Sequence, residues 1–264
     1  MSLFQAAILG LVQGLTEFLP VSSSGHLVIG QALLGVDPRG VTLEVVLHLG
    51  TLSAVLWVYR TRIAELAGGV FTGDKDAWSY VGLIFLASIP AGLVGFFGRS
   101  VFERAFSSPV LAATMLLATG GIVFTLRTTG PGATRERPTA GNSIWIGCAQ
   151  ALAILPGISR SGSTVALGAW LGVDVIRLAE FSFLMSVPAI LGAGLLKISE
   201  LGHGPGLEYG PLTVGFAVAA VTGVAAIRLF IKTLRDGTIH RFAYYCWALG
   251  AVYLVGAAVN SGWR

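Results

Sequence analysis

The sequence has little charge for its length. Only 11% of its 264 residues are Asp, Glu, Lys or Arg, whereas 54% are hydrophobic. A soluble domain must cover its surface with polar side chains, so this composition excludes an ordinary water-soluble protein and indicates an integral membrane protein. The net charge of +4 would suggest nucleic acid in a soluble protein. Here the arginines cluster in short segments beside apolar runs, so we expect no nucleic-acid partner.

Cysteine is also scarce. The two cysteines, Cys148 and Cys246, lie within apolar segments and lack the spacing of a metal site, which excludes a disulfide scaffold and favours simple packing. The first residues, MSLFQAAILG, lack the cationic region of a secretory signal. We therefore expect that they are not a cleaved leader.

Long apolar runs are frequent, and a helix needs roughly 20 apolar residues to cross a membrane. Runs near that length predict six crossing helices, at Leu43–Tyr59, Ser79–Phe97, Pro109–Leu126, Leu178–Leu196, Leu212–Ile231 and Ala243–Val259. Residues 3–36 and 143–173 instead hold two short apolar runs each, separated by Pro, Gly and Ser. Such broken segments occur in membranes where they are buried in protein or line a wet cavity, so each predicts a re-entrant helical hairpin.

The two broken segments are copies of one another. SSSGHLVIGQALLGVD (Ser22–Asp37) aligns with SRSGSTVALGAWLGVD (Ser159–Asp174), with nine of sixteen positions identical. We therefore divide the chain into a first repeat (1–127), a cytoplasmic linker (128–142) and a second repeat (143–264). Three crossing helices separate the two hairpins, and this odd number predicts that the second copy is inverted. The expected fold is an all-α membrane protein with an inverted-topology repeat.

The cations beside the crossing segments predict the orientation. Under this scheme eleven Lys and Arg residues fall on one side, five fall on the other, and Arg160 belongs to neither. The positive-inside rule then places the linker and the loops near residues 60–62 and 232–241 in the cytoplasm, and both termini outside.

Polar side chains gather in the middle of both broken segments. Glu17 and Arg160 lie at corresponding depths, where an ionised group costs on the order of 3 kcal/mol unless it is paired or hydrated. A buried salt bridge between them is the structural alternative, but it would not need the surrounding serines and histidine. We expect His26, Ser23 and Glu17 to meet, because nucleophilic catalysis needs such a set. His48 is interpreted as a helix–helix hydrogen bond.

The two serine motifs favour an anion. SSSGH and SRSGST each follow a proline that breaks the helix, so backbone N–H groups are exposed where the next short helix begins. A helix N-terminus with Ser and Thr hydroxyls binds anions, and phosphate is the obvious one. The planar guanidinium of Arg160 can hold two phosphate oxygens, which a lysine would do less well.

These motifs resemble the undecaprenyl pyrophosphate phosphatase family of the bacitracin-resistance type. The family's signatures stand here as Gln13 with Glu17, as EFLPVSSSGHL from Glu17 to Leu27, and as PGISRSGST from Pro156 to Thr164. The resemblance covers the whole chain. Many members have Glu where this chain has Gln13, a difference that removes a second acid–base group or metal ligand.

The resemblance implies hydrolysis of a C55 polyprenyl pyrophosphate to the monophosphate and inorganic phosphate. This reaction recycles the lipid carrier of peptidoglycan synthesis and confers bacitracin resistance. The implied catalytic set is Glu17, Ser23, His26 and Arg160, with Gln13 in support, and either Ser23 or His26 is the nucleophile. The residues expected to line the phosphate pocket are Ser22, Ser159, Ser161 and Thr164.

The resemblance also implies stimulation by a divalent cation, Mg²⁺ or Ca²⁺. Glu17 is the one carboxylate ligand that the motifs offer, so we expect the substrate's own phosphates to hold most of the metal. The expected location is the bacterial cytoplasmic membrane, with the active site opening to the outer face. A homodimer is compatible with the sequence, which leaves the oligomeric state open.

A polyprenyl-phosphate flippase or transporter, alone or combined with hydrolysis, is the competing function, because inverted broken repeats are a transporter architecture. The copies are unequal, however. The second has Ile154 and Ser163 where the first has Glu17 and His26. This asymmetry argues against transport alone.

Overall fold

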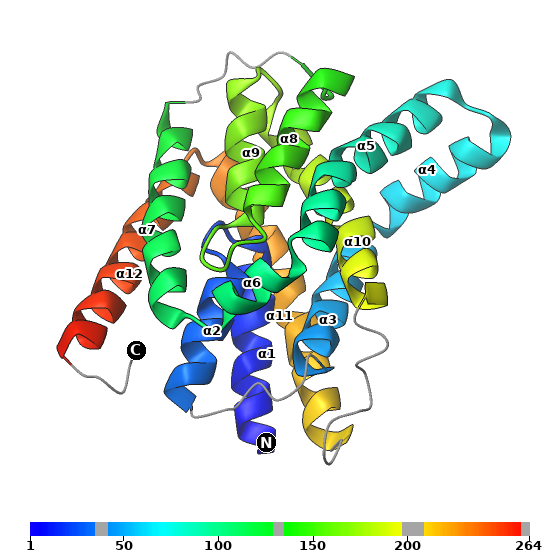
Figure 1. Cartoon of the computed structure of the whole chain (residues 1–264). Coiled ribbons are helices and arrows are strands. Elements are labelled where there is room, and N and C mark those ends of the chain that lie inside the picture. Colours follow the sequence, from blue (N-terminus) through cyan, green and yellow to red (C-terminus); the bar gives the residue numbers. More distant parts are fainter. Residues whose placement is uncertain (35–41, 129–134, 197–208, 260–264) are drawn as a thin grey trace.

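The computed structural model describes residues 1–34, 42–128, 135–196 and 209–259, and within these residues the regular elements are helices (Figure 1). The helices are α1 (Leu3–Phe18), α2 (Ser23–Leu34), α3 (Thr42–Val58), α4 (Arg60–Thr72), α5 (Lys75–Phe97), α6 (Arg99–Phe106), α7 (Pro109–Phe124), η1 (Thr125–Arg127), α8 (Ala140–Leu152), α9 (Arg160–Trp170), α10 (Val175–Leu196), α11 (Tyr209–Arg235), η3 (Ile239–Arg241) and α12 (Phe242–Val259).

Five of the six predicted crossing helices are confirmed, and the sixth, at Leu43–Tyr59, stays a prediction. Five described helical segments are long and apolar enough to cross a membrane: α5, α7 with η1, α10, α11, and η3 with α12. The sixth is α3, which passes the same test together with α4 although the pair is bent by 75°. Helices α4 and α6 were not predicted. The residues of α4 were expected to form a loop, but Arg62 and Glu65 pair at 3.4 Å along one helix face, which favours a helix.

Each predicted hairpin consists of two short helices with a break between them. They have 16 and 12 residues in α1 and α2, and 13 and 11 in α8 and α9, too few for a crossing. Helix α8 begins inside the expected linker because Thr139 caps it, accepting from the Asn142 N–H at 3.2 Å. In Figure 1 the breaks of the two pairs face one another from above and below. Residues 35–36, residues 129–134 of the linker and residues 260–264 lie outside the described residues, and the path of the hairpins through a bilayer stays a prediction.

Helices from the two predicted copies exchange partners. Helix α1 packs along α11, α8 packs along α5, and α7 packs along α12. Glycines permit the first two contacts, since Gly10 faces the backbone of Gly215 and Gly147 faces that of Ala87. Close approach at small residues is typical of membrane helices. The reciprocal exchange is what a two-fold relation between halves would produce, although the repeat boundaries remain a prediction.

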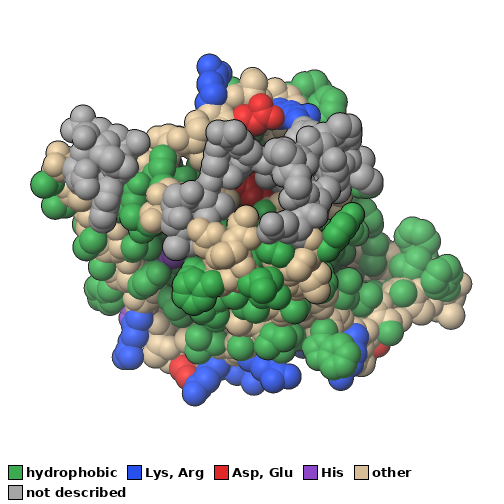
Figure 2. Space-filling model, turned by 90° about the horizontal axis from the view of Figure 1, so that it is seen from below, with side chains coloured by type: hydrophobic (Ala, Val, Ile, Leu, Met, Phe, Trp, Pro, Cys, Tyr) green, Lys and Arg blue, Asp and Glu red, His purple; other side chains and the backbone are tan. Residues whose placement is uncertain are grey.

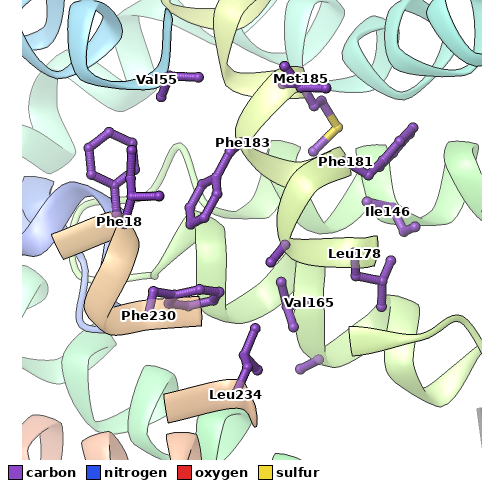
Figure 3. Packing of buried hydrophobic residues seen from close by; sticks show 14 of the residues in the cluster. Phe18, Val55, Ile146, Val165, Leu178, Phe181, Phe183, Met185, Phe230 and Leu234 are labelled. Carbon is purple, nitrogen blue, oxygen red and sulfur yellow. The ribbon is translucent and has the colours of Figure 1, made fainter. Parts of the chain in front are cut away.

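The core lies where α1, α3, α10 and α11 meet, and Figure 3 shows the rings of Phe18, Phe183 and Phe230 gathered there. Phe183 packs edge-on against Phe18 and Phe230, with ring centroids 5.4 and 5.2 Å apart. Phe18 directly follows Glu17, so this core fixes the end of the helix that carries the carboxylate. Large hydrophobic side chains such as Trp57 and Phe97 remain exposed. Hydrophobic side chains also extend around the flank in Figure 2, as a lipid-facing surface requires.

Replacing Gly10 by Ala should destabilise the fold. The added Cβ would lie 2.5 Å from the Gly215 carbonyl oxygen, and separating the two helices should cost about 1–3 kcal/mol. Thermal unfolding in detergent would measure the change. The matched control is Gly121→Ala in α7, where no atom lies within 4 Å of the added Cβ. Equal midpoints for the two variants would contradict the close contact.

Candidate active site

Glu17 lies in the last turn of α1, and both of its carboxylate oxygens accept hydrogen bonds. Oε1 accepts from Nη2 of Arg160 at 2.8 Å, and Oε2 accepts from Ser23 Oγ at 2.5 Å and from Gln13 Nε2 at 3.1 Å. The Glu17 side chain is 9% exposed and that of Arg160 is 14% exposed. The structure therefore brings together Glu17 and Arg160 from the two hairpins, and it places Ser23 and Gln13 beside them, so the salt bridge is formed within a larger polar cluster.

The break after α1 turns Ser23 back towards the carboxylate. Leu19 is extended, and Ser22 adopts a left-handed conformation with φ of 67°. A non-glycine residue held in this region costs about 1–3 kcal/mol, so the surrounding structure must stabilise it. Helix α2 begins at the next residue, which gives the Ser23 hydroxyl its direct contact with Glu17.

The break before α9 is fixed by α7. Gly157 has φ of 97° and lies against the backbone of Ala112, where a Cβ would collide. Thr119 bridges the turn, because its Oγ1 donates to the Gly157 carbonyl at 2.7 Å and accepts from the Ser159 N–H at 3.0 Å. Ser159 in turn caps α9 by accepting from the Gly162 N–H at 3.1 Å. These bonds place the first residue of α9, Arg160, opposite Glu17.

The second branch of the Arg160 guanidinium is anchored by α10. Nη1 donates to the Ser182 carbonyl at 3.0 Å, and the Ser182 hydroxyl shares a 2.7 Å hydrogen bond with Thr164 Oγ1. Thr164 also donates to the Arg160 carbonyl at 2.8 Å. Sequence reasoning missed Ser182, although a hydroxyl inside a predicted crossing helix was a usable signal.

The serines expected to line a phosphate pocket hold the two breaks in shape. Ser22 Oγ accepts from the Gly25 N–H at 3.3 Å, and Ser161 Oγ donates to the Leu19 carbonyl at 3.2 Å, which ties the second break to the first. Ser159 and Ser161 are also paired at 3.3 Å. These contacts place the predicted residues at the junction of the hairpins, and phosphate contact by them stays a prediction.

His26 does not meet Glu17 or Ser23, so the expected cluster of imidazole, hydroxyl and carboxylate is not formed by this histidine. Its Nδ1 lies 2.7 Å from the Ser22 carbonyl oxygen, and its Nε2 lies 2.8 Å from the Tyr245 hydroxyl of α12. The physical reason is that the ring turns back along its own helix to reach the Ser22 carbonyl, and it stacks on Tyr245 on its other side. Tyr245 was missed, since nothing in the sequence links α12 to this turn.

The imidazole beside Glu17 belongs to His48 of α3. Its Nε2 lies 3.8 Å from Glu17 Oε2, and its Nδ1 lies 2.7 Å from the Glu44 carbonyl of the same helix. The side chain is 33% exposed. The structure corrects the interpretation of His48 as a helix–helix hydrogen bond, because it places this imidazole beside Glu17 at the site. An ionisable residue within a predicted crossing helix was the signal that could have found it.

A protein-held metal does not fit this arrangement. The described residues contain no group of three or more His, Cys, Asp or Glu side chains that could hold a metal ion. Both oxygens of Glu17, the predicted ligand, already accept hydrogen bonds from Arg160, Ser23 and Gln13. Hard divalent cations need several oxygen ligands, so no step of the chemistry below depends on such an ion.

The fold and the site define a polytopic α-helical membrane protein with a partly buried carboxylate, hydroxyl and guanidinium between two broken helix pairs. Residues 6–252 match the family model described as bacitracin resistance protein BacA. The chain belongs to this family.

Three similar proteins share the name undecaprenyl-diphosphatase. The relative from Desulfatibacillum aliphaticivorans is 41% identical, and the match covers 95% of this chain and 97% of the relative. The relative from Rhodopirellula baltica is 40% identical over 96% and 97% of the two chains. The relative from Rubrobacter xylanophilus is 41% identical over the same shares.

Replacing Thr119 by the isosteric Val should loosen the second break. The change leaves the Gly157 carbonyl and the Ser159 N–H buried without their partner, and each unsatisfied group costs about 1–3 kcal/mol. We expect a lower thermal-unfolding midpoint than for Thr114→Val, whose exposed hydroxyl donates to the carbonyl of Val110 in its own helix. Two equal midpoints would show that Thr119 does not hold the turn.

Proposed function

We propose that this chain is a membrane phosphatase that hydrolyses undecaprenyl pyrophosphate to undecaprenyl phosphate and inorganic phosphate. Membership of the family and the shared name of its relatives support the substrate. One observation carries the chemistry. The Glu17 carboxylate accepts the Ser23 hydroxyl at 2.5 Å and the Arg160 guanidinium at 2.8 Å.

The contact between Ser23 and Glu17 supports Ser23 as the nucleophile. Ser23 Oγ attacks the terminal phosphorus while its proton passes to Glu17, and the bond to the bridging oxygen breaks to release the polyprenyl monophosphate. Water then attacks the phosphoserine, which releases inorganic phosphate and restores the hydroxyl. A general base must lie within hydrogen-bond distance of the proton that it takes, as Glu17 does. Both ring nitrogens of His26 are engaged elsewhere, which disfavours the alternative nucleophile.

Arg160 supplies the positive charge that phosphoryl transfer needs. In the resting site its Nη2 neutralises Glu17, while Nη1 is held by the Ser182 carbonyl. When Glu17 takes the proton of Ser23, its negative charge disappears. The charge of Arg160 then becomes available to the phosphate oxygens at the moment when negative charge develops on them.

The proposal extends to the cation and to the lipid chain of the substrate. A stimulating Mg²⁺ or Ca²⁺ would arrive bound to the pyrophosphate, since the described side chains form no metal cluster. The polyprenyl chain would lie along the exposed apolar faces of the crossing helices, where side chains such as Trp57 and Phe97 are available. The proposed location of the protein is the bacterial cytoplasmic membrane, with the active site open to the outer face. There the reaction would recycle the lipid carrier and support bacitracin resistance.

The unequal division of the site favours hydrolysis over transport alone. The first copy supplies the carboxylate and the hydroxyl, and the second supplies Arg160. At the position that aligns with Glu17, the second copy has the apolar Ile154. A hydroxyl held by a carboxylate base serves hydrolysis, whereas transport needs only groups that bind the lipid head group.

Replacing Ser23 by Ala tests the proposed function and the nucleophile together. Purified wild-type protein in detergent should release phosphate from undecaprenyl pyrophosphate, and Ser23→Ala should lose several thousand-fold in kcat. A hydroxyl that merely binds phosphate would cost roughly 5- to 150-fold. The control is Ser24→Ala, whose hydroxyl pairs with Ser22 at 3.2 Å and which should retain most activity. Phosphate trapped on His26 would overturn the assignment.

Replacing Arg160 by Lys should reduce kcat/KM by roughly 100-fold or more, although the charge is kept. An ammonium group cannot hold the Ser182 carbonyl, Glu17 and a phosphate with one planar fork. Initial rates of phosphate release measure the loss, and the thermal-unfolding midpoint shows whether the variant is folded. A folded variant with near wild-type kcat/KM would rule out this role for the guanidinium.

A further inference from the structure

The left-handed backbone at Ser22 sets the position of the nucleophile. Ser22 is buried, and it is the one non-glycine residue with positive φ in the described part of the chain. Such a conformation persists only where neighbouring groups hold it. Ser23 is the next residue, and its hydroxyl reaches Glu17 directly from this turn. Whatever holds Ser22 therefore also holds the contact on which the proposed reaction depends.

His26 provides that hold. The Ser22 carbonyl oxygen lies 3.2 Å from the His26 backbone nitrogen and 2.7 Å from His26 Nδ1. A carbonyl can only accept, so Nδ1 carries the proton. In the neutral ring, Nε2 is then an acceptor, and the Tyr245 hydroxyl at 2.8 Å donates to it. The tyrosine thus favours the one neutral tautomer of His26 that can bind the Ser22 carbonyl.

Helix α12 braces the first break at two adjacent positions. The ring of Tyr245 is stacked on that of His26, with centroids 5.6 Å apart and planes within 8°. The next residue, Cys246, places its Sγ 3.8 Å from the Pro20 carbonyl oxygen. The last helix of the second half therefore contacts both ends of the turn that carries Ser22.

The second hairpin offers an internal comparison. At the position that aligns with Ser22, Ser159 has φ of −80° and no left-handed strain. At the position that aligns with His26 stands Ser163, whose buried hydroxyl has no partner among the described residues. The histidine and the left-handed serine occur together in the copy that carries Ser23, and both are absent from the other. This pairing indicates that the imidazole serves the backbone of Ser22.

We propose that Tyr245 and His26 are positioning residues, and that the Tyr245 hydroxyl acts through His26 and Ser22 to aim the Ser23 hydroxyl at Glu17. Neither side chain carries a reacting atom in this scheme. The inference rests on the proposed phosphatase function and deepens it, because it assigns to α12 a part in the geometry of the nucleophile.

Tyr245→Phe keeps the stacked ring and removes only the hydroxyl. Loss of the hold on a strained residue should lower kcat for phosphate release by roughly 5- to 150-fold, and KM should change little, since the pyrophosphate contacts are untouched. The matched control is Tyr244→Phe, the adjacent tyrosine, whose ring packs on Phe124 and Trp247. This control should be as active as the wild type.

Rescue by Ser22→Gly separates positioning from chemistry. Glycine adopts positive φ without strain, so on the Ser22→Gly background Tyr245→Phe should change kcat by only about 2-fold. If His26 and Tyr245 took part in the chemistry itself, Tyr245→Phe would lose the same factor on both backgrounds. That outcome, or a fully active Tyr245→Phe in the Ser22 background, would overturn the inference.

His26→Asn gives an independent test if Tyr245→Phe does not fold. The asparagine amide can still donate to the Ser22 carbonyl, so it should be at least 10-fold more active than His26→Ala. Equal inactivity of these two variants, with both folded, would assign a chemical role to the imidazole and contradict the proposal. A wild-type protein that releases no phosphate would instead refute the proposed function, so the two failures are distinguishable.

Discussion

A largely buried ion pair joins the two broken helix pairs of this protein. Glu17 and Arg160 lie on different broken helix pairs, and their contact at 2.8 Å requires both breaks to end at the same point. Charges taken out of water are expensive unless they are paired and further hydrogen-bonded. Here Ser23 and Gln13 satisfy the carboxylate, and the Ser182 carbonyl satisfies the guanidinium. The Ser159 cap and the left-handed turns at Ser22 and Gly157 hold the two breaks in the shape that brings this pair into contact.

Much of the fold and half of the site could be predicted from the sequence. Apolar runs locate the crossing helices because lipid imposes length and composition on them, and an ionisable residue at membrane depth identified Glu17 and Arg160. The directions of individual side chains could not be predicted in this way. His26 turns to Tyr245, 219 positions away, and His48 turns to Glu17 because of how α3 packs. Neither neighbour can be read from local pattern, and serine gives no signal for the left-handed backbone at Ser22.

The two predicted repeats both begin with a broken helix pair but contribute different chemistry. The first presents a carboxylate and a hydroxyl, and the second presents a guanidinium. The helices also depend on both repeats for their packing, because α1 of the first packs on α11 of the second, and α8 of the second packs on α5 of the first. The site is thus divided between the two predicted repeats, and neither repeat contains a complete centre.

The pairing of α1 with α11 has a consequence for how the chain is made. The ribosome delivers α1 first, yet its main partner begins at Tyr209. The guanidinium that pairs with Glu17 also comes late, because Arg160 is the first residue of α9. Until α9 has been made, the cost of placing the Glu17 carboxylate in lipid is unrelieved. Contacts of such long sequence separation also form slowly, so the packing of α1 on α11 is completed only when synthesis is almost finished.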